Sequence, residues 1–175
     1  DLTVNAGADN DTVNVLQSHT GSLNGDAGSD SFVFSDGTSV SGTIDGGADA
    51  DSLNFAADTD GVVVSLATLP IGVADGITFT SVESATGGST TNDRLEATDG
   101  SNAVNITSAN AGNVDSTFGF TSFENLAGGS VADTADDTFV FSDGASVAGT
   151  IDGVGGTNTL DYTVFTTSVA VTLDA

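Results

Sequence analysis

Aspartate recurs two residues before a pair of apolar residues at i and i+2, and regularly spaced carboxylates can bind hard cations. Asp precedes six of the eight pairs and Asn158 precedes a seventh. If the turns that carry these residues stack, their side chains form a row about 4.8 Å apart along one edge. The eight pairs are Val13/Val15, Phe32/Phe34, Leu53/Phe55, Ile77/Phe79, Leu95/Ala97, Phe118/Phe120, Phe139/Phe141 and Leu160/Tyr162.

Such a row needs cations that the chain does not supply. It has 25 acidic residues, one arginine and no lysine, and its formal net charge is −24. Two carboxylates about 5 Å apart repel by roughly 3 kcal/mol at an effective dielectric near 20. Carboxylate, Asn and backbone oxygens suit Ca²⁺, and no His or Cys cluster favours zinc. The alternative is that each acid caps its own turn. The predicted Ca²⁺ ligands are Asp30 and Asp51, then Asp26 and Asp49 nearby, and Asp9, Asp11, Asp93, Asp137 and Asn158.

The turns before the apolar pairs are rich in glycine. Residues 25–32 and 46–53 approximate the nonapeptide G-G-x-G-x-D-x-U-x. This pattern resembles the calcium-binding repeat of RTX proteins, and similar units occur in long bacterial surface proteins and adhesins. The resemblance implies calcium at the turns and an extracellular or cell-surface location in a bacterium. RTX repeats carry two such nonapeptides per coil, whereas this chain has roughly one, so we expect one partial row of sites.

Two long internal repeats indicate the architecture. Residues 31–46 return as 138–153, an offset of 107 that matches 31–68 to 138–175, and residues 77–88 return as 118–129. Alternating apolar residues predict half-buried strands, and the glycines between them predict turns. Two strands and two turns in about 21 residues make one coil of a solenoid. We therefore predict one all-β domain over 1–175, a parallel β-solenoid of about eight coils, with an antiparallel β-sandwich as the alternative.

The apolar pairs and the remaining polar residues have simpler predicted roles. Most of the ten phenylalanines fall in the pairs and are expected to stack inside the solenoid. Glu83 and Glu124 recur in the shifted repeat and are expected on a solvated edge, or to meet across nearby coils. Only His19 and Arg94 could serve a lyase, and no serine lies in a nucleophile motif. We therefore predict no catalytic residues, although 25 acids leave a glycosidase pair formally open.

The charge and the ends of the chain bear on partners. Strong negative charge disfavours nucleic acid and anionic membranes, and no apolar run approaches the ~18 residues of a membrane span. No signal peptide is visible, so we expect a mature segment or a piece of a longer protein. The strands expected near Leu2/Val4 and over Val169–Leu173 have no polar cap, so they should continue into more chain or associate end to end with another copy.

These features predict an extracellular structural repeat protein, such as an adhesin stalk, a sheath or S-layer component, or a self-assembling filament. A surface module that binds glycans or ice is the alternative from another class. Ice binding would require a regular outward array of threonine, and the outward residues are irregular. Glycan binding usually uses exposed aromatic residues, and nearly all of those present are expected to point inward.

Overall fold

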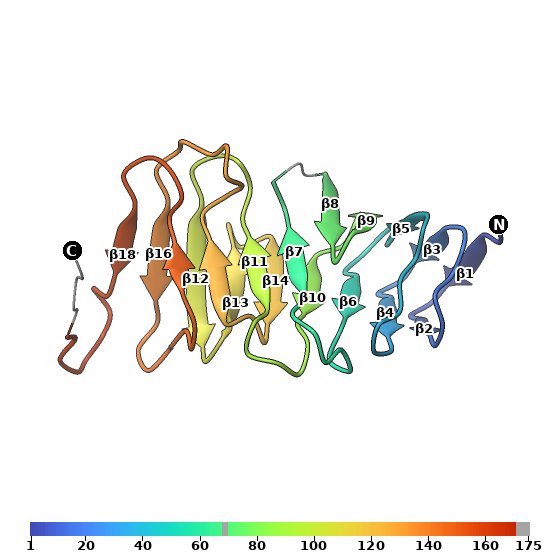
Figure 1. Cartoon of the computed structure of the whole chain (residues 1–175), viewed down its shortest axis with the longest axis horizontal. Coiled ribbons are helices and arrows are strands. Elements are labelled where there is room, and N and C mark those ends of the chain that lie inside the picture. Colours follow the sequence, from blue (N-terminus) through green and yellow to red (C-terminus); the bar gives the residue numbers. More distant parts are fainter. Residues whose placement is uncertain (68–69, 171–175) are drawn as a thin grey trace.

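A computed structural model describes residues 1–67 and 70–170 of the chain, and these residues form an all-β structure. Within them there is no helix, and so no helix that could cross a membrane. The strands form two sheets of nine strands each, which extend from the N-terminal end to the C-terminal end of an elongated molecule (Figure 1). Sheet A contains, in spatial order, β1 (Val4–Ala8), β3 (Leu23–Ala27), β5 (Thr43–Asp45), β9 (Ile77–Thr80), β8 (Ile71–Ala74), β7 (Val63–Ser65), β11 (Arg94–Glu96), β15 (Asn125–Ala127) and β17 (Ile151–Asp152).

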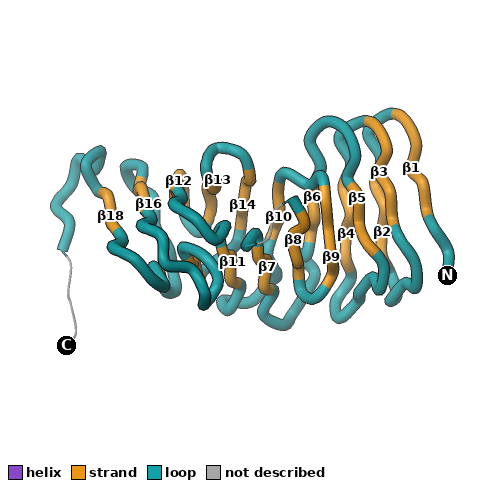
Figure 2. Tube along the Cα trace, turned by 90° about the horizontal axis from the view of Figure 1, so that it is seen from above, coloured by secondary structure: helices purple, strands orange, loops and turns teal. Residues whose placement is uncertain are grey.

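Sheet B has the same number of strands, and most of its pairs are also parallel. The chain alternates between the sheets, so that each strand of the N-terminal part pairs with the strand two places later (Figure 2). The predicted stacking of successive passes is therefore present in this part of the chain. Sheet B contains, in spatial order, β2 (Thr12–Val15), β4 (Ser31–Phe34), β6 (Ser52–Asn54), β10 (Ser84–Thr86), β14 (Phe118–Thr121), β13 (Ala111–Val114), β12 (Ala103–Ser108), β16 (Thr138–Phe141) and β18 (Thr159–Asp161).

Two antiparallel segments interrupt the parallel stacking, which the sequence did not predict. In the first fold-back, β7–β8–β9, strand β8 pairs antiparallel with both β7 and β9, and β9 pairs with β5. In the second fold-back, β12–β13–β14, strand β13 lies antiparallel between the other two. The expectation of a uniformly parallel stack was therefore wrong at these two places.

The fold-backs also shift which apolar pairs are equivalent. Ile77/Phe79 in β9 and Leu95/Ala97 at β11 belong to sheet A, whereas the other pairs belong to sheet B. A fold-back adds two strands within one sheet, and its length is close to that of one full pass. The spacing of about 21 residues between apolar pairs therefore continues across a fold-back, although the chain is then in the other sheet. The eight pairs consequently do not occupy the equivalent positions in eight coils that the sequence had predicted.

The shorter internal repeat, in which residues 77–88 return 41 positions later as 118–129, coincides with the two fold-backs. Residues 77–88 contain β9 and β10 and run from sheet A to sheet B, whereas residues 118–129 contain β14 and β15 and run from sheet B to sheet A. In both fold-backs the middle strand places a glycine opposite the phenylalanine of the repeated unit, Gly72 with Phe79 and Gly112 with Phe120. A methyl group on Gly72 would collide with the Phe79 ring, whereas one on Gly112 would collide first with the Asn105 carbonyl oxygen and would also lie tightly against the Phe120 ring. The repeated unit therefore supplies the last strand of each fold-back and the strand that follows it, on opposite sheets.

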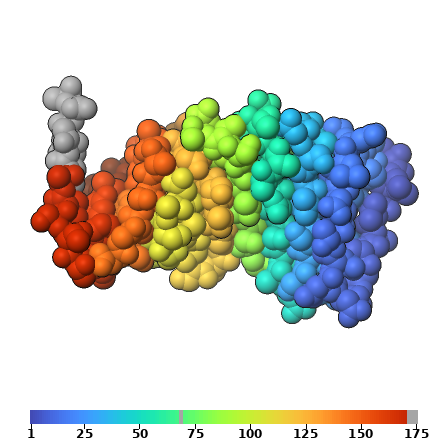
Figure 3. Space-filling model, turned by 90° about the horizontal axis from the view of Figure 1, so that it is seen from below, coloured from blue at the N-terminus to red at the C-terminus, as the bar shows by residue number. Residues whose placement is uncertain are grey.

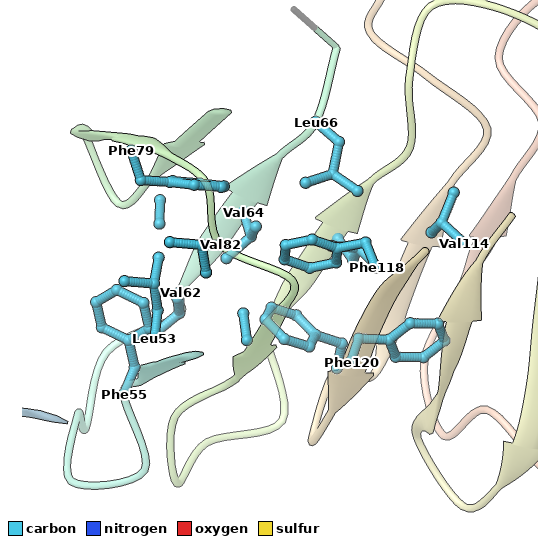
Figure 4. Packing of buried hydrophobic residues seen from close by; sticks show 14 of the residues in the cluster. Leu53, Phe55, Val62, Val64, Leu66, Phe79, Val82, Val114, Phe118 and Phe120 are labelled. Atoms are coloured by element: carbon cyan, nitrogen blue, oxygen red, sulfur yellow. The ribbon is translucent and has the colours of Figure 1, made fainter. Parts of the chain in front are cut away.

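The apolar core lies between the two sheets and includes residues from Val15 to Ala145. Figure 4 shows part of this core from close by. Phe34 and Phe55 stack with ring centroids 4.7 Å apart, and Phe141 and Tyr162, which lie 107 residues later, stack at 4.5 Å. The expected aromatic stacking is thus present in both copies of the long repeat. Consecutive parts of the chain form successive bands along the molecule (Figure 3). Residues 171–173 of the last predicted strand lie outside the described residues.

Candidate cation-binding edges

The turns that lead from sheet A to sheet B form one long edge, which we call the A-to-B edge. Asp11, Asp30, Asp51 and Glu83 immediately precede β2, β4, β6 and β10 on this edge. The N–H of Asp11 donates to Oδ1 of Asp30 at 2.8 Å, and that of Asp30 donates to Oδ1 of Asp51 at 2.7 Å. The N–H of Asp51 donates to Oε2 of Glu83 at 2.8 Å. Three predicted ligands thus lie in one continuous row.

The same edge continues beyond the fold-backs with Asn102, Asp137 and Asn158, which precede β12, β16 and β18. The N–H of Asn102 donates to Oδ1 of Asp137 at 2.9 Å, and the N–H of Asp137 donates to Oδ1 of Asn158 at 2.8 Å. Sequence reasoning missed Glu83 and Asn102. Each lies directly before a strand, as Asp30 and Asp51 do, and that position was the available signal.

Asp93 lies on the opposite edge, in a turn that leads from sheet B to sheet A. Its Oδ1 accepts the N–H of Val62 at 2.7 Å, and its side chain is fully buried. The next acid on this B-to-A edge is Glu124, which is 6% exposed and accepts the Asn110 side-chain amide at 2.9 Å. The predicted single row therefore excludes Asp93. The expectation that Glu124 is solvated was wrong. Its repeated segment, residues 118–129, follows the second fold-back and runs from sheet B to sheet A, so that Glu124 lies buried on the B-to-A edge.

Asp9, Asp26 and Asp49 do not join the buried row. Their side chains are exposed, and their backbone φ angles are 91°, 73° and 76°. Asp residues adopt this left-handed region more readily than most residues do. Asp26 is paired in register with Gly7, which also has positive φ. These three residues therefore shape the turns that present the row. No group of three or more His, Cys, Asp or Glu side chains arranged to hold a metal occurs in residues 1–67 and 70–170.

Six acids of the two edges each keep one buried carboxylate oxygen that has no hydrogen-bond partner among the described residues. Asp30 and Asp51 are only 2% and 1% exposed, so water does not solvate these atoms. An unsatisfied buried polar group costs about 1–3 kcal/mol, and more when it is charged. The six atoms are Oδ2 of Asp30, Asp51, Asp93, Asp133 and Asp137, and Oε2 of Glu124.

Backbone oxygens lie beside some of these unpaired atoms. A methyl group added to Gly25 would meet both Oδ2 of Asp30 and the carbonyl oxygen of Gly46, which belongs to the next pass of the chain. A methyl group on Gly46 would likewise meet Oδ2 of Asp51 and the Ser81 carbonyl oxygen. Each site therefore brings together a carboxylate oxygen and a carbonyl oxygen, both of which are acceptors.

Two positions of the A-to-B edge hold asparagine in place of aspartate, and their side-chain amides donate hydrogen bonds that a carboxylate cannot donate. Nδ2 of Asn102 donates to the Gly128 carbonyl at 2.8 Å, the equivalent next-pass oxygen. Nδ2 of Asn158 donates to the carbonyls of Gly153 and Gly155 at 2.8 and 2.7 Å. Asparagine has the acceptor Oδ1, as aspartate does. Its second atom, Nδ2, is a hydrogen-bond donor, whereas the second atom of aspartate, Oδ2, is another acceptor. The aspartate positions therefore require a proton or a cation.

The electrostatics of the edges favour the same conclusion. Burial raises the pKa of Asp51, Asp93, Glu124 and Asp137, and at Asp51 the nearby charges of Asp30 and Glu83 raise the pKa further. The only basic side chain of the Lys and Arg type, Arg94, pairs with Glu96 in sheet A at 2.6 Å. The protein therefore offers these acids no positive side chain of its own.

Hydrogen-bonded acids at successive turns, glycines that make room for them, and unpaired oxygens beside backbone carbonyls make both edges candidates for binding hard cations. Three comparisons with known proteins, against family models, curated proteins and solved structures, gave no match. The function of the chain must therefore be inferred from its fold and from these buried acids.

Proposed function

We propose that this chain is a segment of a calcium-stabilised β-solenoid with an extracellular structural role. The observation that carries the proposal is the set of buried, unpaired carboxylate oxygens along the edges of two largely parallel sheets. Asp30 and Asp51, with the carbonyls of Gly46 and Ser81, are the proposed centre of calcium binding. Calcium would neutralise the stacked acids and supply the partner that their second oxygens lack.

Two further features fit an extracellular structural role. The absence of cysteine is compatible with any compartment, and in an extracellular protein it means that a bound metal ion would stabilise the fold where disulfides cannot. Extracellular modules commonly bind calcium with Kd values of about 10⁻⁴–10⁻³ M. A site with only a few acidic ligands can reach this affinity, and calcium would therefore occupy it outside cells. The core runs between the sheets for the length of the molecule, which suits a protein that provides length and surface.

We also propose that the terminal strands associate end to end with a second copy or a neighbouring segment. Leu160 in β18 is 46% exposed, whereas Leu53, its equivalent 107 residues earlier, is fully buried beneath the next pass. Among the described residues, the outermost strands of the two sheets are β1 and β2 at one end and β17 and β18 at the other. Unpaired strand edges with apolar neighbours favour pairing with another strand. Analytical ultracentrifugation over a range of concentrations would detect this association, and a monomer at all concentrations would contradict it.

Thermal unfolding followed by circular dichroism tests the calcium proposal. We expect a β spectrum whose Tm rises when CaCl₂ replaces EDTA, with MgCl₂ as the control for ionic strength. A ligand at 100 times its Kd stabilises a folded protein by about 2.7 kcal/mol. A Tm that is the same in EDTA and in millimolar CaCl₂ would contradict the proposal.

A further inference from the structure

The turn between β15 and β16 differs from the other turns of the A-to-B edge. From Gly128 to Asp137 it is four residues longer than the corresponding turns Gly25–Asp30 and Gly46–Asp51. The extra residues form a compact loop in which the N–H of Asp133 donates to the Ser130 carbonyl at 2.9 Å. The N–H of Ala135 donates to Oδ1 of Asp133 at 3.0 Å. The loop is therefore ordered around the Asp133 side chain.

A contact with the preceding pass holds this loop in place. The N–H and hydroxyl of Ser130 donate to Oδ1 and Oδ2 of Asp99 at 2.7 and 3.0 Å. The loop encloses Asp133, whose side chain is 6% exposed although Val131, two residues earlier, is 92% exposed. The insertion thus buries a carboxylate and leaves an apolar residue in solvent, which is the reverse of what packing alone favours.

The buried Asp133 lies beside the row residue Asp137. Oδ2 of Asp137 packs against Gly128, Oδ2 of Asp133 packs against Gly129, and both oxygens lack a hydrogen-bond partner in the described chain. The Gly153 carbonyl of the next pass also borders Gly128. Oδ1 of Asp137 is already used, because it accepts the N–H and the side-chain amide of Asn102 at 2.9 Å each. Two free carboxylate oxygens of one turn therefore lie next to a double-glycine step.

We propose that Asp133 and Asp137 bind one Ca²⁺ ion in this turn, with the Gly153 carbonyl as a further oxygen donor. A proton would neutralise only one of the two carboxylates, whereas a divalent ion neutralises both. Hard oxygen donors and a glycine backbone suit calcium. Asp133 lies outside the repeated pattern of one acid per turn, so this site is additional to the row. It rests on the proposed function only in the choice of calcium as the ion.

Calcium titration of the whole 175-residue chain by isothermal calorimetry tests the site, with Tb³⁺ luminescence as a second readout. Asp133→Asn keeps the Oδ1 acceptor for the loop and removes one ligand charge. Asp136→Asn is the matched control, because Asp136 is exposed in the same loop and its Oδ1 accepts the N–H of Thr157. We expect Asp133→Asn to lose one calcium equivalent and Asp136→Asn to keep the wild-type number. Circular dichroism in EDTA establishes that both variants fold.

The double variant Asp30→Asn/Asp51→Asn separates this site from the row. We expect it to keep the equivalent that Asp133→Asn loses. If Asp133→Asn binds the wild-type number of ions with the wild-type Kd, the loop site is refuted, and a loss in the double variant would still support the row. If the double variant binds as wild type while Asp133→Asn does not, the row is refuted and the loop site stands. If Asp133→Asn only abolishes a pH-dependent transition without changing calcium binding, the occupant is a proton and the proposal is overturned.

Discussion

Replacing Asp51 with asparagine is expected to have opposite effects with and without calcium. The introduced side chain would keep Oδ1 as the acceptor for the N–H of Asp30, as Asn158 does for Asp137. Its Nδ2 would replace the unpaired Oδ2 and could donate to the Ser81 carbonyl, which now lies beside it. In EDTA the variant should therefore be more stable than the wild type. In calcium it should be stabilised less, because a proposed ligand charge is gone.

The size of the effect follows from the unpaired oxygen. Leaving a buried acceptor without a partner costs about 1–3 kcal/mol, so Asp51→Asn should raise the free energy of unfolding in EDTA by about that amount. In a chain of this length, 1 kcal/mol shifts Tm by roughly 2–4 °C, so the expected increase is about 2–12 °C. Asp51→Ala removes the Oδ1 acceptor as well, and we expect it to destabilise the protein in both conditions.

Urea and thermal unfolding at pH 7.5, in EDTA and in 5 mM CaCl₂ (a concentration chosen as roughly ten times a weak extracellular Kd), would measure these differences. Asn102→Asp is the reciprocal change, since it replaces an amide that donates to the Gly128 carbonyl with a carboxylate. It should destabilise the protein in EDTA. If Asp51→Asn and Asp51→Ala destabilise the protein equally in EDTA, the second oxygen of Asp51 is not short of a donor and the reasoning fails.

Three other predictions concern the core, a fold-back and pH. Phe55→Ala removes a stacked ring from the core and should cost about 3–5 kcal/mol in urea unfolding, whereas Val131→Ala on the surface should change stability by less than about 0.5 kcal/mol; equal effects would contradict the assigned core. Gly112→Ala should cost about 1–3 kcal/mol because its methyl group would meet a backbone carbonyl and a phenyl ring, and Gly100→Ala, with open space around it, is the control. Hydrogen bonds from the hydroxyl and the N–H of Thr166 lower the pKa of Asp143 in the folded protein. These hydrogen bonds therefore stabilise the fold fully above the pKa that Asp143 has in the unfolded chain, and this stability is lost as the pH falls through its pKa in the folded protein. Asp143→Asn should lessen the loss of Tm on acidification, and an unchanged slope would refute this assignment.

The row of acids could be predicted in part because its position relative to a strand is visible in the sequence. Asp30 and Asp51 each follow a glycine by five residues and directly precede an alternating strand. Glu83 occupies the same position but follows a fold-back, and its longer side chain reaches the N–H of Asp51 from there. The acid two residues before the Ile77/Phe79 pair is Asp75, which lies in the hairpin turn between β8 and β9. Residue spacing identifies an equivalent position only while the chain keeps its path.

The fold-backs were missed because alternation predicts a strand and says nothing about its direction. The side chains of β8 alternate between exposed and buried, as those of a parallel strand would, although β8 runs antiparallel to both of its neighbours, β7 and β9. The available signal was the Asp75-Gly76 pair between two alternating segments, a sequence typical of a two-residue hairpin with positive φ at both positions. The φ angles are 46° and 78°. The second fold-back uses Asp115 and Ser116 at φ angles of 51° and 59°, and without a glycine its turn is harder to detect.

The fold-backs also affect the order in which the molecule can assemble during synthesis. In sheet A the neighbour of β5 is β9, and the ribosome makes β9 after β7. The two neighbours of β7 are β8 and β11, and both are also made after it. A nascent chain that has emerged only as far as β7 therefore cannot add that strand to the ordered part. Growth strand by strand, the usual route for repeat proteins, is replaced here by the joint docking of the block β7–β8–β9, which pairs with β5 through β9. A truncation within this block should consequently be far less tolerated than one placed directly after β6.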